Sequence, residues 1–219
     1  MIYIIKKREP RSLTKYKQDP FAYFNGCPKQ SIKQSLFEEQ GHLCAYCMRR
    51  IQDVSEMTIE HYKPQHPQNT EESNRQDSLN YNNMLGVCLG NRGCEKRLQT
   101  CDAHRGNTPL TVDPLNQSSI DKIAYRTNGL IYSDDPAINT DLNVTLNLNF
   151  KEGSLIKSRK QAVDNLKQYL LKKQPQGQWS RTLLSKAKVE FSKSTDGAKL
   201  EYLGILLFYI EKYLRRCNK

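Results

Sequence analysis

The chain has 219 residues, of which 26% are charged and 37% hydrophobic, a composition that excludes global disorder and allows one large domain or two small ones. The formal net charge is +11 and the pI is about 9.3, which favours a polyanionic partner, nucleic acid first and an acidic protein or membrane surface second. Residues 151–219 hold 16 Lys or Arg against 6 Asp or Glu, so a net +10 of this charge lies near the C-terminal end.

The N-terminus and the apolar runs predict a cytoplasmic protein without a membrane partner. Basic residues follow the apolar residues Met1–Ile5, which is the reverse of a secretory signal, and the apolar part is too short for one. The longest apolar run, Leu203–Ile210, is far shorter than the ~20 residues of a membrane helix. The cysteines number seven, and the Cys44-Ala45-Tyr46-Cys47 spacing suits a metal site better than a disulfide framework.

Local patterns in the first half of the chain predict a mixture of strands and helices. β-Branched and aromatic residues predict a short strand at Met1–Ile5, and an exposed basic arm follows it. Pro28–Gln40 has one apolar face and is typical of a helix. Met57–His61 alternates as a strand does, residues 65–76 are typical of a polar loop, and an apolar rhythm resumes over Leu79–Cys88.

The second half begins with a linker and continues with a hairpin. Pro114–Ser119 is typical of a linker, and Ile123–Tyr132 carries the strongest hairpin signal in the chain, two apolar runs around an Asn-Gly pair. Leu142–Phe150 alternates like a strand, although it is rich in Asn. Apolar stripes predict three helices, at Leu155–Lys173, Arg181–Lys193 and Ala198–Arg216. Most of their apolar surface is expected in the core, and a smaller share in docking of a partner.

The cysteines predict a structural zinc site. Cys44 and Cys47 can both reach one Zn²⁺ from a tight turn, and a tetrahedral site then needs a second pair from elsewhere. We expect Cys88 and Cys101 to form that pair, because Cys94 lies in a segment with Gly and Arg that is typical of an insertion.

Two alternatives to this ligand set stay open. Cys94 could replace Cys88 or Cys101, or Cys101 could bind zinc together with His104 while Cys88 stays free. The remaining two cysteines, at positions 27 and 217, are expected to be plain thiols.

Four motifs, in this order, resemble those of the HNH endonucleases: Cys-x-x-Cys at 44–47, Ile-Glu-His-Tyr-Lys-Pro at 59–64, Leu-Asn-Tyr-Asn-Asn-Met-Leu-Gly-Val-Cys at 79–88, and Cys-Asp-x-x-Arg-Gly-Asn at 101–107. The resemblance covers about residues 44–107 and implies the ββα-metal fold. Over most of the chain, the basic N-terminal arm and the helical tail look like the HNH subunit of Septu-type anti-phage systems (PtuB), including the members encoded with retrons. This narrower resemblance implies an SMC-like or ABC-type ATPase partner (PtuA), and with retrons a reverse transcriptase and its msDNA.

The resemblance also implies roles in phosphodiester hydrolysis, which needs an activated water and a cation that stabilises the charge growing on the phosphate. His61 takes the place of the general base, since a neutral imidazole accepts a proton near physiological pH. Glu60 offers a hard oxygen to a catalytic Mg²⁺ or Mn²⁺. Asn83 takes the place of the asparagine that orients the base by hydrogen bonding, and Asn82 replaces it if the register differs by one.

At the third motif this sequence departs from the family's pattern. Asp102 stands where the family usually has Asn or His, and a carboxylate remains a good ligand for a divalent metal ion. His104 is the alternative to Asp102, and Arg105 is expected to contact phosphate.

Together these inferences predict an α+β protein with a ββα-metal HNH core and a four-cysteine zinc site, followed by a short β-hairpin and a mostly helical C-terminal region. The expected parts are the basic arm and helix (1–43), the nuclease core (44–113) and a region for partner or nucleic-acid contact (114–219). The predicted function is a metal-dependent endonuclease acting on DNA or RNA in an anti-phage complex. A non-catalytic zinc-stabilised subunit that binds nucleic acid or protein is the alternative.

Overall fold

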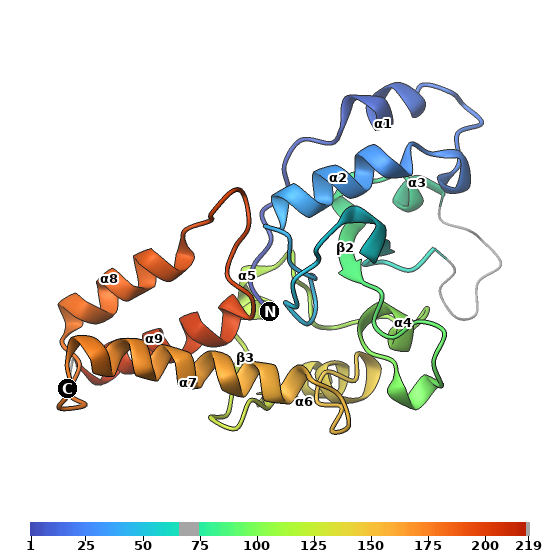
Figure 1. The fold of residues 1–219 in the computed structure, drawn as a ribbon. Coiled ribbons are helices and arrows are strands. Elements are labelled where there is room, and N and C mark those ends of the chain that lie inside the picture. Colours follow the sequence, from blue (N-terminus) through green and yellow to red (C-terminus); the bar gives the residue numbers. More distant parts are fainter. Residues whose placement is uncertain (66–74, 218–219) are drawn as a thin grey trace.

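The computed structural model describes residues 1–65 and 75–217, and it shows a mixed α+β chain with two small antiparallel sheets and several helices (Figure 1). Most of the polar loop expected at 65–76 lies outside the described residues. The strands are β1 (Met57–His61), β2 (Met84–Cys88), β3 (Ile123–Tyr125) and β4 (Ile131–Ser133), and the helices are α1 (Arg11–Tyr16), α2 (Lys29–Glu39), α3 (Arg75–Ser78), α4 (Cys101–Arg105), α5 (Gln117–Ile120), α6 (Pro136–Thr140), α7 (Leu155–Lys173), α8 (Arg181–Ser192) and α9 (Leu203–Arg216).

Helix α2 and the β1–β2 pair form the layer that carries the site. The helix predicted at 28–40 is confirmed as α2, and the two strands pair antiparallel with Met57 opposite Cys88. Gln40, at the end of α2, fastens the helix to β2: its amide donates to the carbonyl of Gly86 at 2.7 Å and accepts from the Gly86 amide at 2.7 Å. A Cβ at position 86 would push against the terminal methyl of Met57 and crowd the side-chain amide of Gln40, so glycine leaves room for this close approach.

Helix α4 follows β2 in the chain and packs against it. The segment between β2 and α4 closes into a loop, because the Thr100 amide near its end donates to the carbonyl of Gly90 near its beginning at 2.9 Å. The Cys101 amide then donates to the carbonyl of Leu146 at 2.9 Å, which ties the start of α4 to the second half of the chain.

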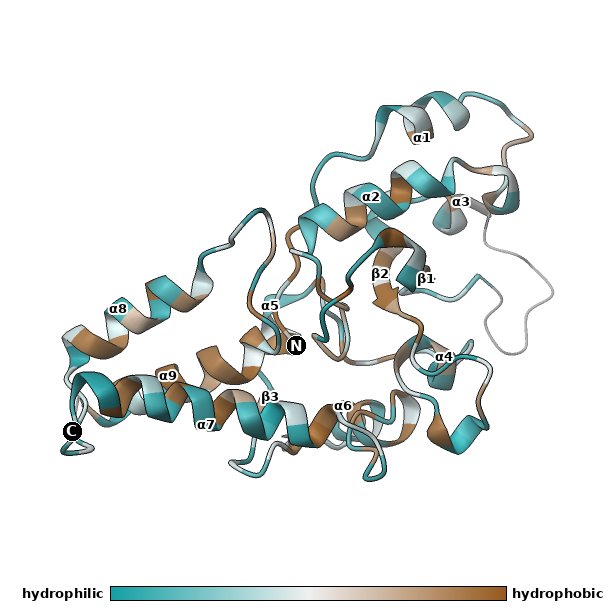
Figure 2. Cartoon of the chain, viewed as in Figure 1, coloured by the Kyte–Doolittle hydropathy of each residue, from teal (hydrophilic) through white to brown (hydrophobic). Residues whose placement is uncertain are grey.

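The second half of the chain contains the predicted hairpin, β3 and β4, whose turn carries Gly129 at a positive φ of 91°. Two predicted helices are confirmed as α7 and α8, and the third begins at Leu203 instead of Ala198. Helices α7 and α8 both pack against α9 (Figure 1). Figure 2 shows that apolar residues dominate α9, whereas α7 and α8 mix apolar and polar turns. In the described parts of the chain, no helix has the length and apolar composition needed to cross a membrane.

The strand predicted near the N-terminus is wrong, whereas the basic arm that follows it is exposed at Arg11, Lys15 and Lys17. Met1–Ile5 belongs to no sheet, and its Ile4 amide makes a single backbone bond, to the carbonyl of Pro114 at 2.9 Å. The arm is partly helical, as α1, and Lys6, which precedes it, forms an ion pair with the buried carboxylate of Glu39. Sequence pattern reports that a segment is apolar or basic, but it does not report whether a partner strand or an opposite charge lies beside it.

The strand-like alternation over Leu142–Phe150 is also misleading, since residues 141–145 form one irregular helical turn. Leu142 and Leu146 are fully buried, while Val144 between them is 64% exposed. Asparagine side chains in this segment bond to nearby groups instead of to a strand partner, as when Asn143 donates to the carbonyl of Asn139 at 2.9 Å. The predicted linker contains α5, and buried side chains from all three expected parts of the chain join one core.

Candidate functional site

Four buried cysteines, Cys44, Cys47, Cys88 and Cys101, gather within 4.8 Å of one another. The distance between Sγ atoms is 3.9 Å for Cys44 and Cys101, 3.7 Å for Cys47 and Cys88, and 3.8 Å for Cys88 and Cys101. These separations are far longer than the ~2.05 Å of a disulfide bond. They match the edge of about 3.8 Å that a tetrahedron has when each sulfur lies ~2.3 Å from a central Zn²⁺.

The cluster therefore fits a structural zinc ion, and it is made of the four cysteines chosen from the sequence. Cys94 and Cys217 are exposed, and Cys27 is buried elsewhere. His104 also lies outside the cluster, since its Nδ1 contacts the carbonyl of Thr145 at 3.0 Å. The cluster joins the turn after α2, the end of β2 and the start of α4, so a bound ion would hold these three elements together.

A cleft of about 370 Å³ opens between β1 and the beginning of α4. Glu60 and His61 line it from the end of β1, and Asp102 lines it from α4. Three of the predicted site residues therefore converge on one cavity, next to the cysteine cluster through the Cys101–Asp102 peptide bond.

His61 is held in a defined orientation at this cleft. Its Nε2 lies 2.9 Å from the carbonyl oxygen of Ser78, and its ring meets Phe24 edge-on with centroids 4.5 Å apart. A carbonyl oxygen only accepts, so Nε2 carries the hydrogen and Nδ1 is left as the basic nitrogen of the neutral ring. Burial lowers the pKa of His61 below its ordinary value, which favours this neutral form.

Glu60 is buried and surrounded by donors. Tyr46 donates to its Oε1 at 3.0 Å, and Arg105 forms an ion pair with the same carboxylate. Burial, and then the charge of the neighbouring Asp102, raise the pKa of Glu60 to about 8 despite the opposing effect of Arg105. Because the charge of Asp102 raises the pKa of Glu60, a divalent cation placed between these two carboxylates would be favourable.

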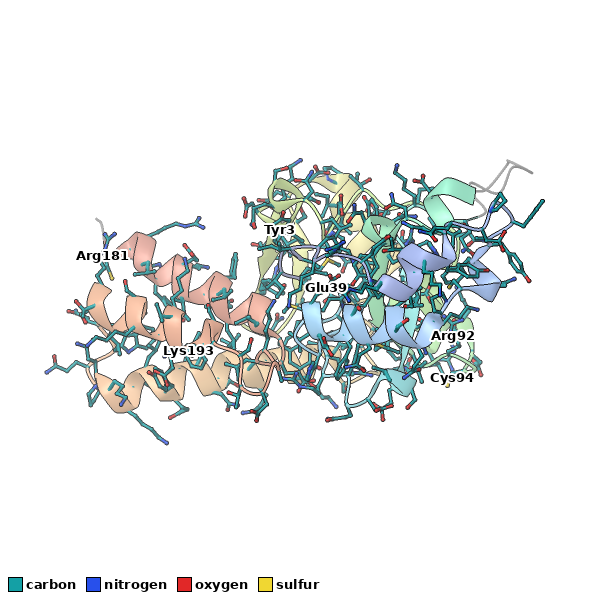
Figure 3. All side chains as sticks on the ribbon, turned by 90° about the horizontal axis from the view of Figure 1, so that it is seen from above. Tyr3, Glu39, Arg92, Cys94, Arg181 and Lys193 are labelled. Carbon is teal, nitrogen blue, oxygen red and sulfur yellow. The ribbon has the colours of Figure 1, made fainter. Side chains whose placement is uncertain are left out.

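Asp102 pairs with a basic residue of the segment that precedes it. Arg92 forms an ion pair with Oδ2 of Asp102, and the hydroxyl of Thr58 donates to the same oxygen at 3.4 Å. Figure 3 shows Arg92 beside Cys94, at the opposite end of the molecule from Arg181, the first residue of α8, and from Lys193, which follows that helix.

The two carboxylates of Glu60 and Asp102 are compatible with Mg²⁺ or Mn²⁺. In the described residues, the cysteine cluster is the one group of three or more Cys, His, Asp or Glu side chains close enough to hold a metal ion. An ion at the two carboxylates would therefore complete its shell with amide oxygens, water or substrate phosphate, which is the usual situation for Mg²⁺.

Asn83, the residue expected to orient the base, bonds to backbone groups near His61. Its side chain accepts from the Lys63 amide at 2.7 Å and donates to the carbonyls of Lys63 and Asp77, each at 3.0 Å. Asn83 thus ties Lys63, two residues after His61, to Asp77, the residue before Ser78. The carbonyl of Ser78 in turn contacts the imidazole of His61. Asn82, the fallback, is exposed.

Two residues of the last motif lie elsewhere than expected. His104 is not among the residues that line the cleft. Arg105 is buried, and its guanidinium bonds to Glu60, to Tyr46 at 3.0 Å and to the carbonyl of Tyr62 at 2.6 Å. The expectation that Arg105 contacts phosphate is therefore wrong, because this side chain is enclosed by the residues that it supports.

Sequence reasoning missed other residues that line the cleft, among them Phe24, Arg92 and Asn107. The first two come from outside the four motifs, so spacing offered no signal for them. Asn107 is the last residue of the fourth motif, and this position could have marked it as a residue of the site.

Comparison with known proteins supports the resemblance of the motifs. No protein-family model matches the chain. A curated protein of Vibrio cholerae serotype O1 biovar El Tor, named "Retron Vc95 putative HNH endonuclease", is 27% identical over 103 residues. The aligned part is 47% of each chain, so the chain spans about half the length of the curated relative that it matches. This distant similarity supports an HNH-type endonuclease.

Proposed function

We propose that this chain is a metal-dependent HNH endonuclease that hydrolyses phosphodiester bonds of nucleic acid. The observation that carries the proposal is the cleft in which Glu60, His61 and Asp102 converge beside the cysteine cluster. The order β1, β2, α4 around that cluster supports a ββα-metal core. The similarity to a protein named as an HNH endonuclease supports the same reaction class.

In this function, His61 accepts the proton of the attacking water at Nδ1, while Ser78 holds the other ring nitrogen. Glu60 and Asp102 would hold the divalent cation, which stabilises negative charge on the phosphate when bound. Tyr46 and Arg105 hold the side chain of Glu60 in place, and the more exposed Arg92 forms an ion pair with Asp102.

The direct test is incubation of the purified chain with DNA and RNA, in Mg²⁺ or Mn²⁺, alone and with its partner. We expect cleavage that needs the added ion. Binding without cleavage under every one of these conditions would overturn the enzyme assignment. It would favour the alternative of a zinc-stabilised binding subunit, whose main support is the net +10 charge of residues 151–219.

Replacement of Asp102 by Asn should weaken Mn²⁺ binding by about tenfold or more, since even outer partners of metal sites are worth ~10–100-fold in affinity. Isothermal titration of Mn²⁺ measures this effect without relying on activity. Asp121→Asn is the matched control, because Asp121 is exposed and lies outside the cleft. Equal affinities for the two variants would remove Asp102 from the proposed site.

Asn83→Ala should lower kcat by about 10²-fold with little change in KM, because a misplacement of ~1 Å at the reacting groups has that cost. The reason is that Asn83 holds the backbone on both sides of the base. Asn82→Ala, at the exposed neighbour, should retain the parent rate. A larger loss in the Asn82 variant would contradict this role.

We further propose that the nuclease is the Septu-type effector of a cytoplasmic anti-phage complex with an SMC-like or ABC-type ATPase, and with a retron reverse transcriptase and its msDNA where these are encoded nearby. The retron context of the curated relative supports the defence setting. Co-expression of the chain with the neighbouring gene products, followed by purification, tests it. Absence of an ATPase from both the locus and the purified complex would contradict the proposal.

A further inference from the structure

Two aromatic rings stand in solvent next to the cleft. Phe21 is 81% exposed and Tyr23 is 60% exposed, and Phe24 follows them directly in the chain. Phe24 itself lines the cleft and packs edge-on against His61. The exposed pair is therefore joined to the cleft by Phe24, the residue that follows Tyr23 in the chain.

The loop that carries these rings is firmly held. The hydroxyl of Tyr16 in α1 donates to the carbonyl of Tyr23 at 3.0 Å and accepts from the Tyr23 amide at 3.3 Å. Asp19 accepts from the Phe21 amide at 2.8 Å, and Ala22 between the two rings is buried. The backbone is thus anchored on both sides of each ring, so the fold itself presents the rings to solvent.

These rings are the most exposed aromatic side chains in the described part of the chain, where one other large aromatic, Tyr3, is 38% exposed. Isolated exposed aliphatic residues need no explanation, but adjacent rings on an anchored loop form a small surface suited to a flat, apolar partner. The faces of nucleobases are such a partner, and stacking on aromatic side chains tolerates any base.

Charge around the loop favours a nucleic acid over other flat ligands. Lys29 places its Nζ 5.1 Å from the centre of the Phe24 ring, and Lys15 and Arg11 are exposed on the preceding helix α1. Cationic side chains interleaved with aromatic rings are the usual surface for a single-stranded nucleic acid. In a duplex the base faces are already stacked on one another, so rings on a surface loop cannot reach them without unstacking.

We propose that Phe21 and Tyr23 stack against unpaired bases of a single-stranded nucleic acid whose backbone runs past Phe24 into the cleft. The inference rests on the proposed nuclease function and names its substrate class: single-stranded segments of DNA or RNA, including loops and ends. Base stacking outside the cleft would fix the strand while the adjoining phosphate reaches His61.

The test measures binding by the full-length chain without added Mg²⁺ or Mn²⁺, so that cleavage does not interfere. Fluorescently labelled single-stranded DNA, single-stranded RNA and duplex DNA are compared by anisotropy, in lengths above the ~16 nucleotides of a large single-strand site. The double variant Phe21→Ala/Tyr23→Ala should bind both single strands at least about fivefold more weakly for each ring removed, and should bind duplex as the parent does. Preference for one single strand identifies DNA or RNA as the substrate.

The matched control is Val144→Ala/Val189→Ala, which removes two exposed apolar side chains outside the cleft and should leave all affinities unchanged. A second variant, Phe21→Trp, keeps a stacking ring and should retain affinity, and its added fluorescence should be quenched by single strands. The signal is the difference from the parent protein, whose one tryptophan is Trp179.

Equal single-strand affinities for parent and double variant, or an equal loss for duplex, would overturn the inference. An effect of the double variant on protein association with unchanged oligonucleotide binding would overturn it in favour of a protein-docking loop. These results differ from failure of the proposed function, which would appear as an absence of cleavage in Mg²⁺ or Mn²⁺ even if stacking is demonstrated.

Discussion

His61→Ala is expected to lower the cleavage rate by about 10²- to 10⁴-fold, the usual contribution of a positioned general base. Its Nε2 contacts the carbonyl oxygen of Ser78, so Nδ1 is the nitrogen that would take the proton from water in the proposed reaction. Single-turnover cleavage under excess enzyme measures the rate of the chemical step. Zinc content and the thermal unfolding midpoint, measured on the same preparation, should stay close to those of the parent.

His104→Ala is the matched control for this prediction. Both side chains are histidines of the motif segments, but His104 contacts the carbonyl of Thr145 and lies outside the residues that line the cleft. We therefore expect the His104 variant to keep most of its activity. Full activity in a pure His61→Ala preparation, or a larger loss in the His104 variant, would transfer the role of base away from His61.

Cys88→Ser is expected to abolish cooperative unfolding and to reduce the zinc content from one ion per chain to a substoichiometric amount. Structural zinc contributes about 10–16 kcal/mol to small zinc domains, while net stabilities of proteins are only about 5–15 kcal/mol. Cys88 lies 3.7 Å from Cys47 and 3.8 Å from Cys101, so its loss separates β2 from the other elements of the cluster. Calorimetry and elemental analysis measure the two effects.

Cys94→Ser provides the control, because Cys94 is exposed and lies outside the cluster. It should unfold as the parent does and keep its zinc. A strong chelator should reproduce the Cys88→Ser phenotype in the parent protein. A cooperatively folded, zinc-free Cys88 variant would show that packing around α2 and β2 suffices without the ion.

Local sequence pattern was enough to place the helices, strands and turns whose formation depends on the residues of the element itself. The alternation of Met57–His61, the periodicity of Leu155–Lys173 and the Asn-Gly turn near residue 128 each correspond to an observed element. The choice of Cys88 and Cys101 over Cys94 also agrees with the observed cluster. Such signals arise from chemistry repeated at short range, where helix and strand periods dictate which side chains share a face.

The Cys-x-x-Cys spacing, the Glu60–His61 pair and the basic tail were readable in the sequence itself, since they depend on residue type and order. Only the tertiary structure decided that Arg105 supports Glu60 from inside the core, and that Phe24, from an unrelated segment, meets His61. The physical reason is that burial and charge pairing between distant segments depend on how whole layers pack. Short-range periodicity carries no record of that packing.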